Sequence, residues 1–190
     1  AVGGLAAAIV VRDPARHPEA AARAVRLGSR IHRSLEDLLA AEAGRVDLVI
    51  LATGIPEHAS QAEAALEAGF AVLCEKPVAG SWADALRIQA AARRSGRLLA
   101  VGYQHLQSAS LQRIRGLVAS RRLGRLVAAR GLVLSPRSAA YYERNRWAGR
   151  MTVDGIAVGD SPIQNAAGHY LMNLLFVAGG ALLLMARPGS

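Results

Sequence analysis

Residues 47 to 104 read DLVILATGIPEHASQAEAALEAGFAVLCEKPVAGSWADALRIQAAARRSGRLLAVGYQ and carry the alternation of patterns that decides the fold. Three short apolar runs have the length of buried strands, VDLVILAT (46–53), FAVLCEK (70–76) and LLAVGY (98–103). Two helical patterns separate them and each ends at a glycine, EHASQAEAALEAG (57–69) and WADALRIQAAARRSG (82–96). Because the runs are apolar on both faces, they predict a parallel sheet with helices on both sides.

The same alternation continues toward the N-terminus. AAAIVV (6–11) reads as a further buried strand, and HPEAAARAVRLG (17–28) reads as a helix that ends at a glycine. Two capping pairs precede helical patterns, Ser34 with Asp37 and Ser81 with Asp84. The fold class expected from the sequence is therefore α/β, built from successive βαβ units.

Polar residues follow the apolar runs at the points where the strands are expected to end. In a parallel sheet, ligands bind at the carboxyl ends of the strands. The residues at these points are Thr53, Glu75, Lys76, Tyr103 and Gln104. We therefore expect the functional site to form around them.

The start of the chain lacks a motif that such a sheet usually contains. A dinucleotide-binding sheet opens with a strand that runs into G-x-G-x-x-G, whereas the only early glycines here are Gly3 and Gly4. They precede a strand whose end, VVRDPAR (10–16), resembles the second strand of such a unit. We expect the first strand and its phosphate loop upstream of residue 1, and an N-terminally incomplete Rossmann-type domain over residues 1 to 125.

The pattern changes after residue 125. LVAARGLVLSPRSAAYYERNRWAGRM (126–151) is more polar and aromatic and contains strand-like stretches. We expect residues 126 to 190 to be the beginning of an α+β domain for substrate binding and oligomerisation.

The composition argues against several function classes. The net charge of +9 suggests a nucleic-acid partner, but the arginines are scattered and the densest patch, residues 111 to 130, has no interleaved aromatic residues. The apolar run 170 to 186 is interrupted by polar and glycine residues and is shorter than the roughly 20 residues of a membrane span. The single cysteine, Cys74, excludes an intrachain disulfide, favours a buried thiol and indicates a reducing compartment. We therefore expect a cytoplasmic protein with no nucleic-acid or membrane partner.

Lys76 is the only lysine in the chain, and the other 22 basic residues are all arginine. Arginine is effectively always protonated, whereas a desolvated lysine can lose its proton near neutral pH. A site that must both give and accept a proton therefore cannot replace lysine by arginine. Lys76 is a catalytic candidate, and the alternative is a surface lysine that escaped the compositional bias.

Three motifs together resemble one protein family. E-K-P (75–77) closes a strand, a T-P-x-x-x-H-like segment (53–58) precedes it and V-G-Y (101–103) follows it. In this combination the sequence resembles the glucose-fructose oxidoreductase / inositol dehydrogenase (Gfo/Idh/MocA) family of NAD(P)-dependent oxidoreductases. The resemblance is firm from about residue 31 to residue 126 and thinner beyond.

The resemblance implies roles for the residues at the strand ends. Lys76 would face the nicotinamide and the substrate hydroxyl, Glu75 would lie near the cofactor, and the Lys76–Pro77 peptide is often cis in relatives. Further cofactor contacts would come from Thr53, Gly54, His58, Tyr103 and Gln104. Gly54 stands where the family usually has proline, and Leu106 replaces an arginine that relatives often carry. No metal ion is expected.

The stretch DSPIQNAAGHYLMNLLFVAG (160–179) supplies two more candidates. Relatives commonly place an Asp and a His four residues apart on a helix that faces the nicotinamide, and Asn165 and His169 have this spacing. Residues i and i+4 share a helix face, so both would reach one substrate. Because an amide cannot take up a proton as a carboxylate does, Lys76 and His169 would share the acid–base work while Asn165 orients the hydroxyl.

Arg12 bears on the choice between NAD and NADP. The second strand of the family usually ends in an acidic residue for the ribose diol, but Val11 stands there with Arg12 next. An arginine at this point neutralises a 2′-phosphate, which favours NADP. A surface arginine is the alternative in so arginine-rich a chain.

The expected reaction is reversible hydride transfer between a nicotinamide cofactor, NAD or NADP, and a hydroxyl-bearing carbon of a sugar or cyclitol. Two alternatives remain open on the sequence: a glycoside hydrolase or lyase of the same family that retains its NAD, and a catalytically inactive chain that acts as a binding module. Relatives pair through the open sheet of the second domain, which leaves a homo-oligomer open, and the sequence does not decide the oligomeric state.

Overall fold

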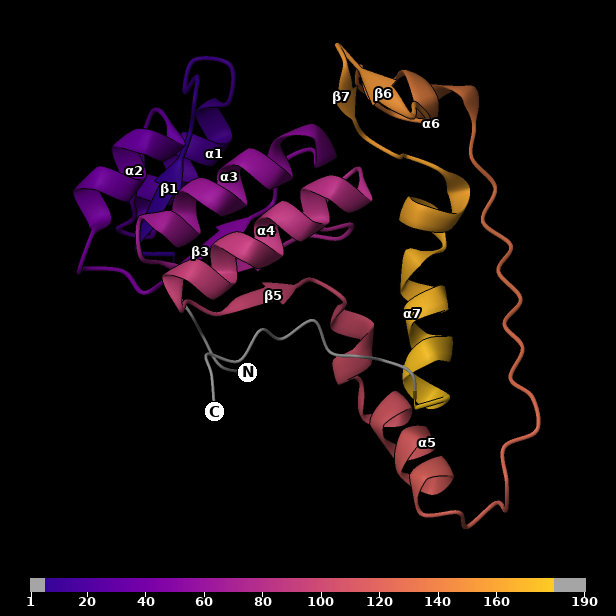
Figure 1. Cartoon of the computed structure of the whole chain (residues 1–190). Coiled ribbons are helices and arrows are strands. Elements are labelled where there is room, and N and C mark those ends of the chain that lie inside the picture. The colour runs from indigo at the N-terminus through magenta and orange to yellow at the C-terminus, as the bar shows by residue number, and fades with distance from the viewer. Residues whose placement is uncertain (1–5, 180–190) are drawn as a thin grey trace.

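The structure, a computed structural model, describes residues 6 to 179. The first part alternates strands and helices in the order β1 (Ala8–Val10), α1 (Pro18–Arg26), β2 (Arg30–His32), α2 (Leu35–Glu42), β3 (Leu48–Leu51), α3 (Ile55–Glu67), β4 (Ala71–Cys74), α4 (Trp82–Ser95) and β5 (Leu99–Val101). The second part contains η1 (Gln104–Gln107), α5 (Ala109–Ala119), α6 (Ala139–Glu143), β6 (Thr152–Val153), β7 (Ile156–Ala157), the π-helical turn η2 (Pro162–Ala166) and α7 (Gly168–Val177). Figure 1 shows both parts.

All strands of the first part pair in parallel, which confirms the predicted α/β class. β1 pairs with β2, and β3, β4 and β5 form a separate sheet in that order. The registers place Leu48 beside Ala71 and Val72 beside Leu99. Strands β1, β3, β4 and β5 are each shorter than the apolar run that predicted them, whereas β2 was not predicted from the sequence. The polar ends of the runs after β3, β4 and β5 form the turns in which candidate site residues lie.

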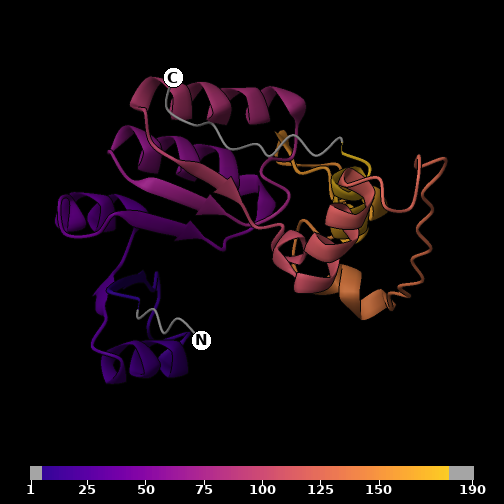
Figure 2. The ribbon, with the colours of Figure 1, turned by 90° about the horizontal axis from the view of Figure 1, so that it is seen from below.

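Helices α3 and α4 pack against the same face of the β3–β4–β5 sheet (Figure 2). Alternate residues of each strand point into this core, so Leu51 is 3% exposed while Ile50 is 62% exposed. Two successive right-handed crossovers that move in one direction across a sheet place both helices on one side. Within residues 6 to 179, the outer face of β3 is therefore only partly covered, although its composition predicted cover on both faces.

Both predicted capping pairs are confirmed. Ser34 Oγ accepts the amide of Asp37 at 3.0 Å, and Ser81 Oγ accepts the amide of Asp84 at 3.1 Å. These bonds satisfy amide groups that the first turns of α2 and α4 leave without partners.

A buried carboxylate joins β2 to α2. Glu42 has no exposed side-chain surface and accepts hydrogen bonds from both Nε and Nη2 of Arg30, while its Oε1 lies 2.9 Å from His32 Nε2. The hydrogen bond from Arg30 is the largest cause that lowers the pKa of Glu42 from 4.5 to about 2. This ion pair anchors the N-terminal βαβα segment.

The second part has less regular structure than its sequence predicts. Residues 125 to 137 form no strand and run as an extended, almost entirely exposed segment between α5 and α6, which Figure 1 shows as the long orange trace. α7 returns beside α5, where the Arg115 guanidinium lies 4.3 Å from the ring centre of Phe176. The strand-like stretches expected after residue 125 are thus reduced to the β6–β7 hairpin.

The apolar run 170 to 186 lies only partly within the described residues. Its first part belongs to α7, whose ten residues end at Val177. Among residues 6 to 179, no helix combines the length and the apolar character that a membrane crossing requires. Cys74 is buried in β4, as predicted, and burial is the main cause that raises the pKa of its thiol to about 12.

Candidate functional site

Lys76 is the second residue after β4, and its peptide bond to Pro77 is cis. The loop that carries it is tied to α3 by His58, whose Nδ1 lies 2.8 Å from the carbonyl oxygen of Pro77. The Nε2 atom of the same ring lies 3.1 Å from the carbonyl oxygen of Thr53, at the end of β3. The buried His58 therefore links the ends of two neighbouring strands.

The Lys76 amine is held by a single residue from the distant second part of the chain. Nζ donates to the backbone oxygen and to the side-chain Oδ1 of Asn165, both at 2.7 Å. Burial lowers the pKa of Lys76 below its usual value of 10.5, while the charges of Glu75 and Asp160 oppose this shift and that of Arg137 adds to it. Lys76 is thus a half-buried amine with two fixed hydrogen-bond acceptors.

Asp160 completes this arrangement, although sequence reasoning missed it. The residue is 7% exposed; its Oδ1 accepts Nδ2 of Asn165 and its Oδ2 accepts the backbone amide of Gly149, both at 2.6 Å. Asp160 is the only carboxylate after residue 154, and this isolation in an apolar segment is the sequence signal that points to it.

His169 lies close enough to Lys76 for the charge of the amine to act on it. Its ring stacks on His105 with centroids 4.2 Å apart and meets the edge of Tyr103 at 5.8 Å. Burial lowers the pKa of His169, and the charges of His105 and Lys76 lower it further. Its buried Nδ1 has no hydrogen-bond partner within the described residues. Sequence reasoning missed His105, which lies beside the predicted Gln104.

Asn165 and His169 do not lie on one continuous helix, as their spacing had suggested. Asn165 belongs to the π-helical turn η2, and α7 begins only at Gly168. The break turns Asn165 toward Lys76, while His169 stacks with His105. The two residues still belong to one cluster.

The other predicted cofactor residues occupy the expected strand ends. Thr53 and Gln104 are exposed, and the Thr53 hydroxyl donates to Gln61 Oε1 at 2.7 Å. The Glu75 carboxylate lies against Gly102, where an added Cβ would be 3.3 Å from it. Thr53, Glu75 and Gln104 therefore lie in the turns that follow β3, β4 and β5.

Gly54 permits a close contact between the two parts of the chain. A Cβ atom at this position would lie 2.9 Å from Nε1 of Trp147. The glycine, in place of the proline usual in the family, therefore leaves room for the Trp147 indole on the turn after β3.

Arg12 is exposed just after the end of β1, next to the buried Val11. It forms no ion pair with any residue between 6 and 179. Its guanidinium is therefore available to an anionic group at the end of this strand.

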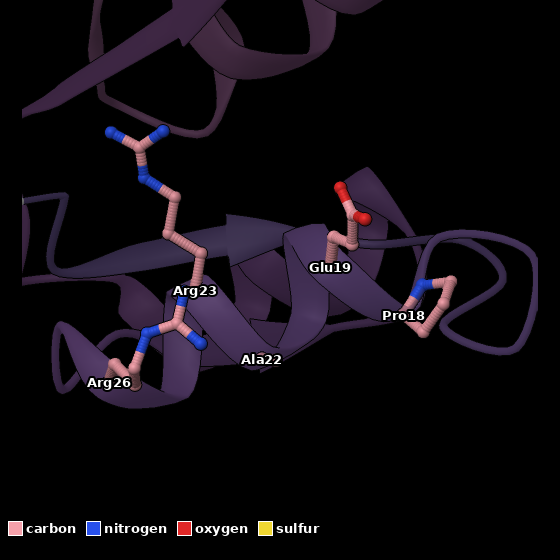
Figure 3. A pocket seen from close by; sticks show the side chains of 5 residues that line it. All are labelled: Pro18, Glu19, Ala22, Arg23 and Arg26. Atoms are coloured by element: carbon pink, nitrogen blue, oxygen red, sulfur yellow. The ribbon is translucent and has the colours of Figure 1, made fainter.

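A separate hollow lies along the surface of α1 (Figure 3). Its lining residues all come from this one helix: Pro18, Glu19, Ala22, Arg23 and Arg26. It shares no residue with the cluster around Lys76, and the helix offers no second wall to enclose a ligand.

Comparisons with known proteins agree with this geometry. Residues 5 to 103 match the family described as "Oxidoreductase family, NAD-binding Rossmann fold". Inositol 2-dehydrogenase from Streptomyces avermitilis is 38% identical over 116 residues, or 60% of this chain and 33% of that protein. A 1-carboxy-3-chloro-3,4-dihydroxycyclohexa-1,5-diene dehydrogenase from Comamonas testosteroni is 31% identical over 153 residues, or 80% of this chain and 36% of that protein.

A solved structure extends the similarity into the second part of the chain. The WlbA dehydrogenase from Bordetella pertussis, in complex with NADH and UDP-GlcNAcA, superimposes with a TM-score of 0.72 at 30% identity, covering 91% of this chain and 51% of that one. The chain thus spans about half of this structure and about a third of the curated relatives above. The family match includes all the parallel strands and Lys76, so this protein belongs to the Gfo/Idh/MocA family of oxidoreductases with an NAD-binding Rossmann fold.

Proposed function

We propose that this chain carries the catalytic lysine of an NAD(P)-dependent oxidoreductase that transfers a hydride between the cofactor and a hydroxyl-bearing carbon of a sugar or cyclitol. The observation that carries the proposal is the pair of 2.7 Å hydrogen bonds from Lys76 Nζ to Asn165. A relative named for inositol and a solved structure in complex with UDP-GlcNAcA support the substrate class.

The two bonds leave one position on the amine for the substrate. A neutral amine has two N–H groups and a lone pair, and an ammonium has three N–H groups. The backbone oxygen and Oδ1 of Asn165 take two N–H groups in either state. The remaining direction therefore holds a lone pair that removes a hydroxyl proton, or an N–H that returns it, without any movement of the side chain.

His169 is placed to assist. The lowered pKa keeps its imidazole neutral at pH 7, and the unpaired Nδ1 can accept or donate one hydrogen bond according to its tautomer. In the proposed site, His169 orients the substrate hydroxyl and Lys76 exchanges its proton. Asn165 orients the lysine through Oδ1, rather than the substrate as its sequence position suggested.

The residues present fit the nicotinamide end of a cofactor, because the polar side chains of Glu75 and Gln104 lie in the turns at the carboxyl ends of β4 and β5, where parallel sheets bind ligands. Glu75, Tyr103 and Gln104 would hold this end, and Thr53 with Gly54 would line its approach. When bound, the cofactor supplies the hydride acceptor or donor. The unpaired Arg12 at the end of β1 favours NADP, since its guanidinium can bind a 2′-phosphate.

Fluorescence titration of the full chain with NADH and NADPH tests cofactor binding. We expect saturable binding that is tighter for NADPH, and we expect Arg12→Ala to remove the difference between the two cofactors. Absence of saturable binding to either cofactor would contradict the proposal and favour an inactive binding module.

Cofactor reduction with a panel of sugars and cyclitols then tests the chemistry. Lys76→Arg retains the positive charge but cannot act as a base near neutral pH. We expect this variant to bind cofactor like the wild type and to lose at least about 100-fold in turnover, the scale of general acid–base catalysis. Equal turnover in both proteins would exclude Lys76 as the proton-exchanging group.

A further inference from the structure

The Asp160 carboxylate is fixed between the backbone of Gly149 and the side chain of Asn165. Each of its two oxygens accepts one hydrogen bond, at 2.6 Å in both cases. It makes no ion pair within the described residues, and it does not cap the following turn, because Ser161 Oγ accepts the Gln164 amide there. Burying a carboxylate costs free energy, and neither an ion pair nor a capping role accounts for the position of Asp160.

The explanation lies in the two ends of the Asn165 amide. Only the oxygen end can accept the Lys76 amine, whereas the nitrogen end would point N–H groups at it. The Asp160 carboxylate accepts hydrogen bonds and cannot donate them in its charged form. By holding Nδ2, it forces Oδ1 of the same amide toward Nζ of Lys76.

We infer that Asp160 is a positioning residue for the proposed reaction: it fixes the Asn165 amide so that Lys76 keeps its second acceptor, and it places a negative charge two hydrogen bonds away from the amine, beyond that amide. The inference concerns the proposed catalytic site, but it predicts the protonation of Lys76 whether or not the chain turns over substrate. A carboxylate in direct contact would strongly favour the ammonium form, and the intervening amide weakens this effect.

Other charged and titratable groups around Lys76 must be held constant in a test. They come from the strand ends, the extended segment and α7: Glu75, Arg137 and His169. Variants confined to Asp160 and Asn165 leave all three in place.

The sole lysine makes the test direct. Incorporation of ¹³C-labelled lysine into the full chain yields one side-chain Cε signal, whose shift with pH reports the pKa of Lys76 alone. In Asp160→Asn, an NH2 group replaces one of the two carboxylate oxygens, so either the hydrogen bond from Gly149 or the one from Asn165 is lost, and the negative charge is lost as well. We expect the pKa of Lys76 to fall by about one unit, because both changes disfavour the ammonium form.

The double variant Asp160→Asn, Asn165→Asp exchanges the two side chains and can retain the hydrogen bonds. The amide introduced at position 160 accepts from Gly149 and donates to the carboxylate introduced at position 165, which accepts from Lys76 directly. We expect the pKa of Lys76 to rise above the wild-type value by about 1 to 3 units. The opposite shifts of the two variants distinguish a positioning role from a general loss of structure.

Asp154→Asn is the matched control, because Asp154 is an exposed carboxylate in the same part of the chain, paired with Arg146 at 2.6 Å. We expect it to leave the Lys76 titration unchanged. The inference is overturned if the single Asp160 variant leaves the titration at the wild-type position, or if the double variant does not raise it. A failure of cofactor binding alone would contradict the proposed function and leave this measurement intact.

Discussion

At the scale of single residues, the site holds its lysine with an amide rather than a carboxylate. Asn165 offers two acceptors to Lys76 without adding a net charge beside it. Burial then dominates and lowers the pKa of the amine, while Asp160, one residue further out, opposes the shift only through its field. The pKa of the amine is therefore lower than that of an exposed lysine, while nearby carboxylates limit the shift. A lowered pKa suits a group that must both remove and return a proton.

His105 is expected to control the protonation of His169. The two rings stack 4.2 Å apart, and the charge of His105 is the second cause, after burial, that lowers the pKa of His169. We therefore expect His105→Gln to raise the pKa of His169, as measured by NMR titration of the histidine ring protons. His17→Gln, an exposed position before α1, is the control and leaves that pKa unchanged. A fall of the pKa in His105→Gln would contradict the argument.

The sequence indicated Lys76, Asn165 and His169 because their residue types and motifs carry chemistry. It did not indicate Asp160 or His105, because their roles depend on contacts with particular partner atoms. The hydrogen bond from Lys76 to Asn165 joins residues 89 positions apart, and only the folded chain shows which amide atom faces which neighbour.

At the scale of elements, the loop after β4 is locked to the second part of the chain through Gly80. A Cβ atom there would overlap the backbone oxygen of Ala157 in β7. This close approach of two backbones holds the β6–β7 hairpin against the segment that leads into α4. The neighbouring Gln164 side chain reinforces it by donating to the oxygen of Ala79 at 3.1 Å.

Gly80→Ala is expected to destabilise the protein by about 1 to 3 kcal/mol, because a methyl group overpacks a contact made by backbone atoms. Gly116→Ala is the matched control: Gly116 lies in α5, and a Cβ atom there meets nothing within 4 Å. We expect the control to stabilise the protein by about 1 kcal/mol through helix propensity. Urea denaturation measures the free energy of unfolding of both variants and of the wild type. Equal effects of the two substitutions would show that Gly80 makes no restrictive contact.

The buried Glu42 carboxylate is expected to make the protein less stable as the pH falls from 4.5 toward 2. Its pKa is about 2 in the folded chain against 4.5 in the unfolded chain, so the unfolded state binds more protons between these values. The contribution is present above pH 4.5 and is lost as the pH falls toward 2. We therefore expect Glu42→Gln to lower the melting temperature at pH 7, and the gap to the wild type to narrow below pH 4.5.

Glu36→Gln, in the exposed first turn of the same helix α2, is the control for this measurement. We expect its melting temperature to follow the wild type across the pH range. A gap between Glu42→Gln and the wild type that widens below pH 4.5 would contradict the assigned ion pair.

The elements of the first part follow closely from local sequence, because capping pairs, terminal glycines and apolar runs act over a few residues. Ser34, Ser81 and Gly96 each mark a helix end where they were expected. The apolar sequence of β3 also predicted helices over both faces of the strand, but its outer face is only partly covered within residues 6 to 179. A continuous apolar run shows that both faces of a strand can be buried, but the helices that bury them are set by the topology of the whole sheet.

At the scale of the whole molecule, the parallel-sheet part and the second part meet at few places. Lys76 contacts η2, Gly54 contacts Trp147, and Gly80 contacts Ala157 of β7. The extended segment connects α5 to α6 without contributing a strand. Both parts therefore supply groups to the candidate site, and the residues that join them in sequence contribute little to holding them together.

Limited trypsin digestion is expected to cut first within this extended segment. Arg125, Arg130 and Arg137 are exposed there, and no backbone–backbone hydrogen bond is made between residues 125 and 137. Proteases need an extended, accessible backbone, and other arginines such as Arg23 and Arg93 lie within helices. Mass spectrometry should identify the first fragments as ending in this segment, close to the predicted domain boundary at residue 125.

The nicked protein should remain one particle on size-exclusion chromatography, because the packing of α7 on α5 and the bonds from Lys76 to Asn165 do not depend on the cut segment. Replacement of Arg125, Arg130 and Arg137 by glutamine is the control, and it should slow the first cut without changing the melting temperature. A first cut within α1 or α4 would show that the sheet part opens more readily than the connection. Separation of the fragments would show that the contacts around Lys76 are too weak to hold the candidate site together.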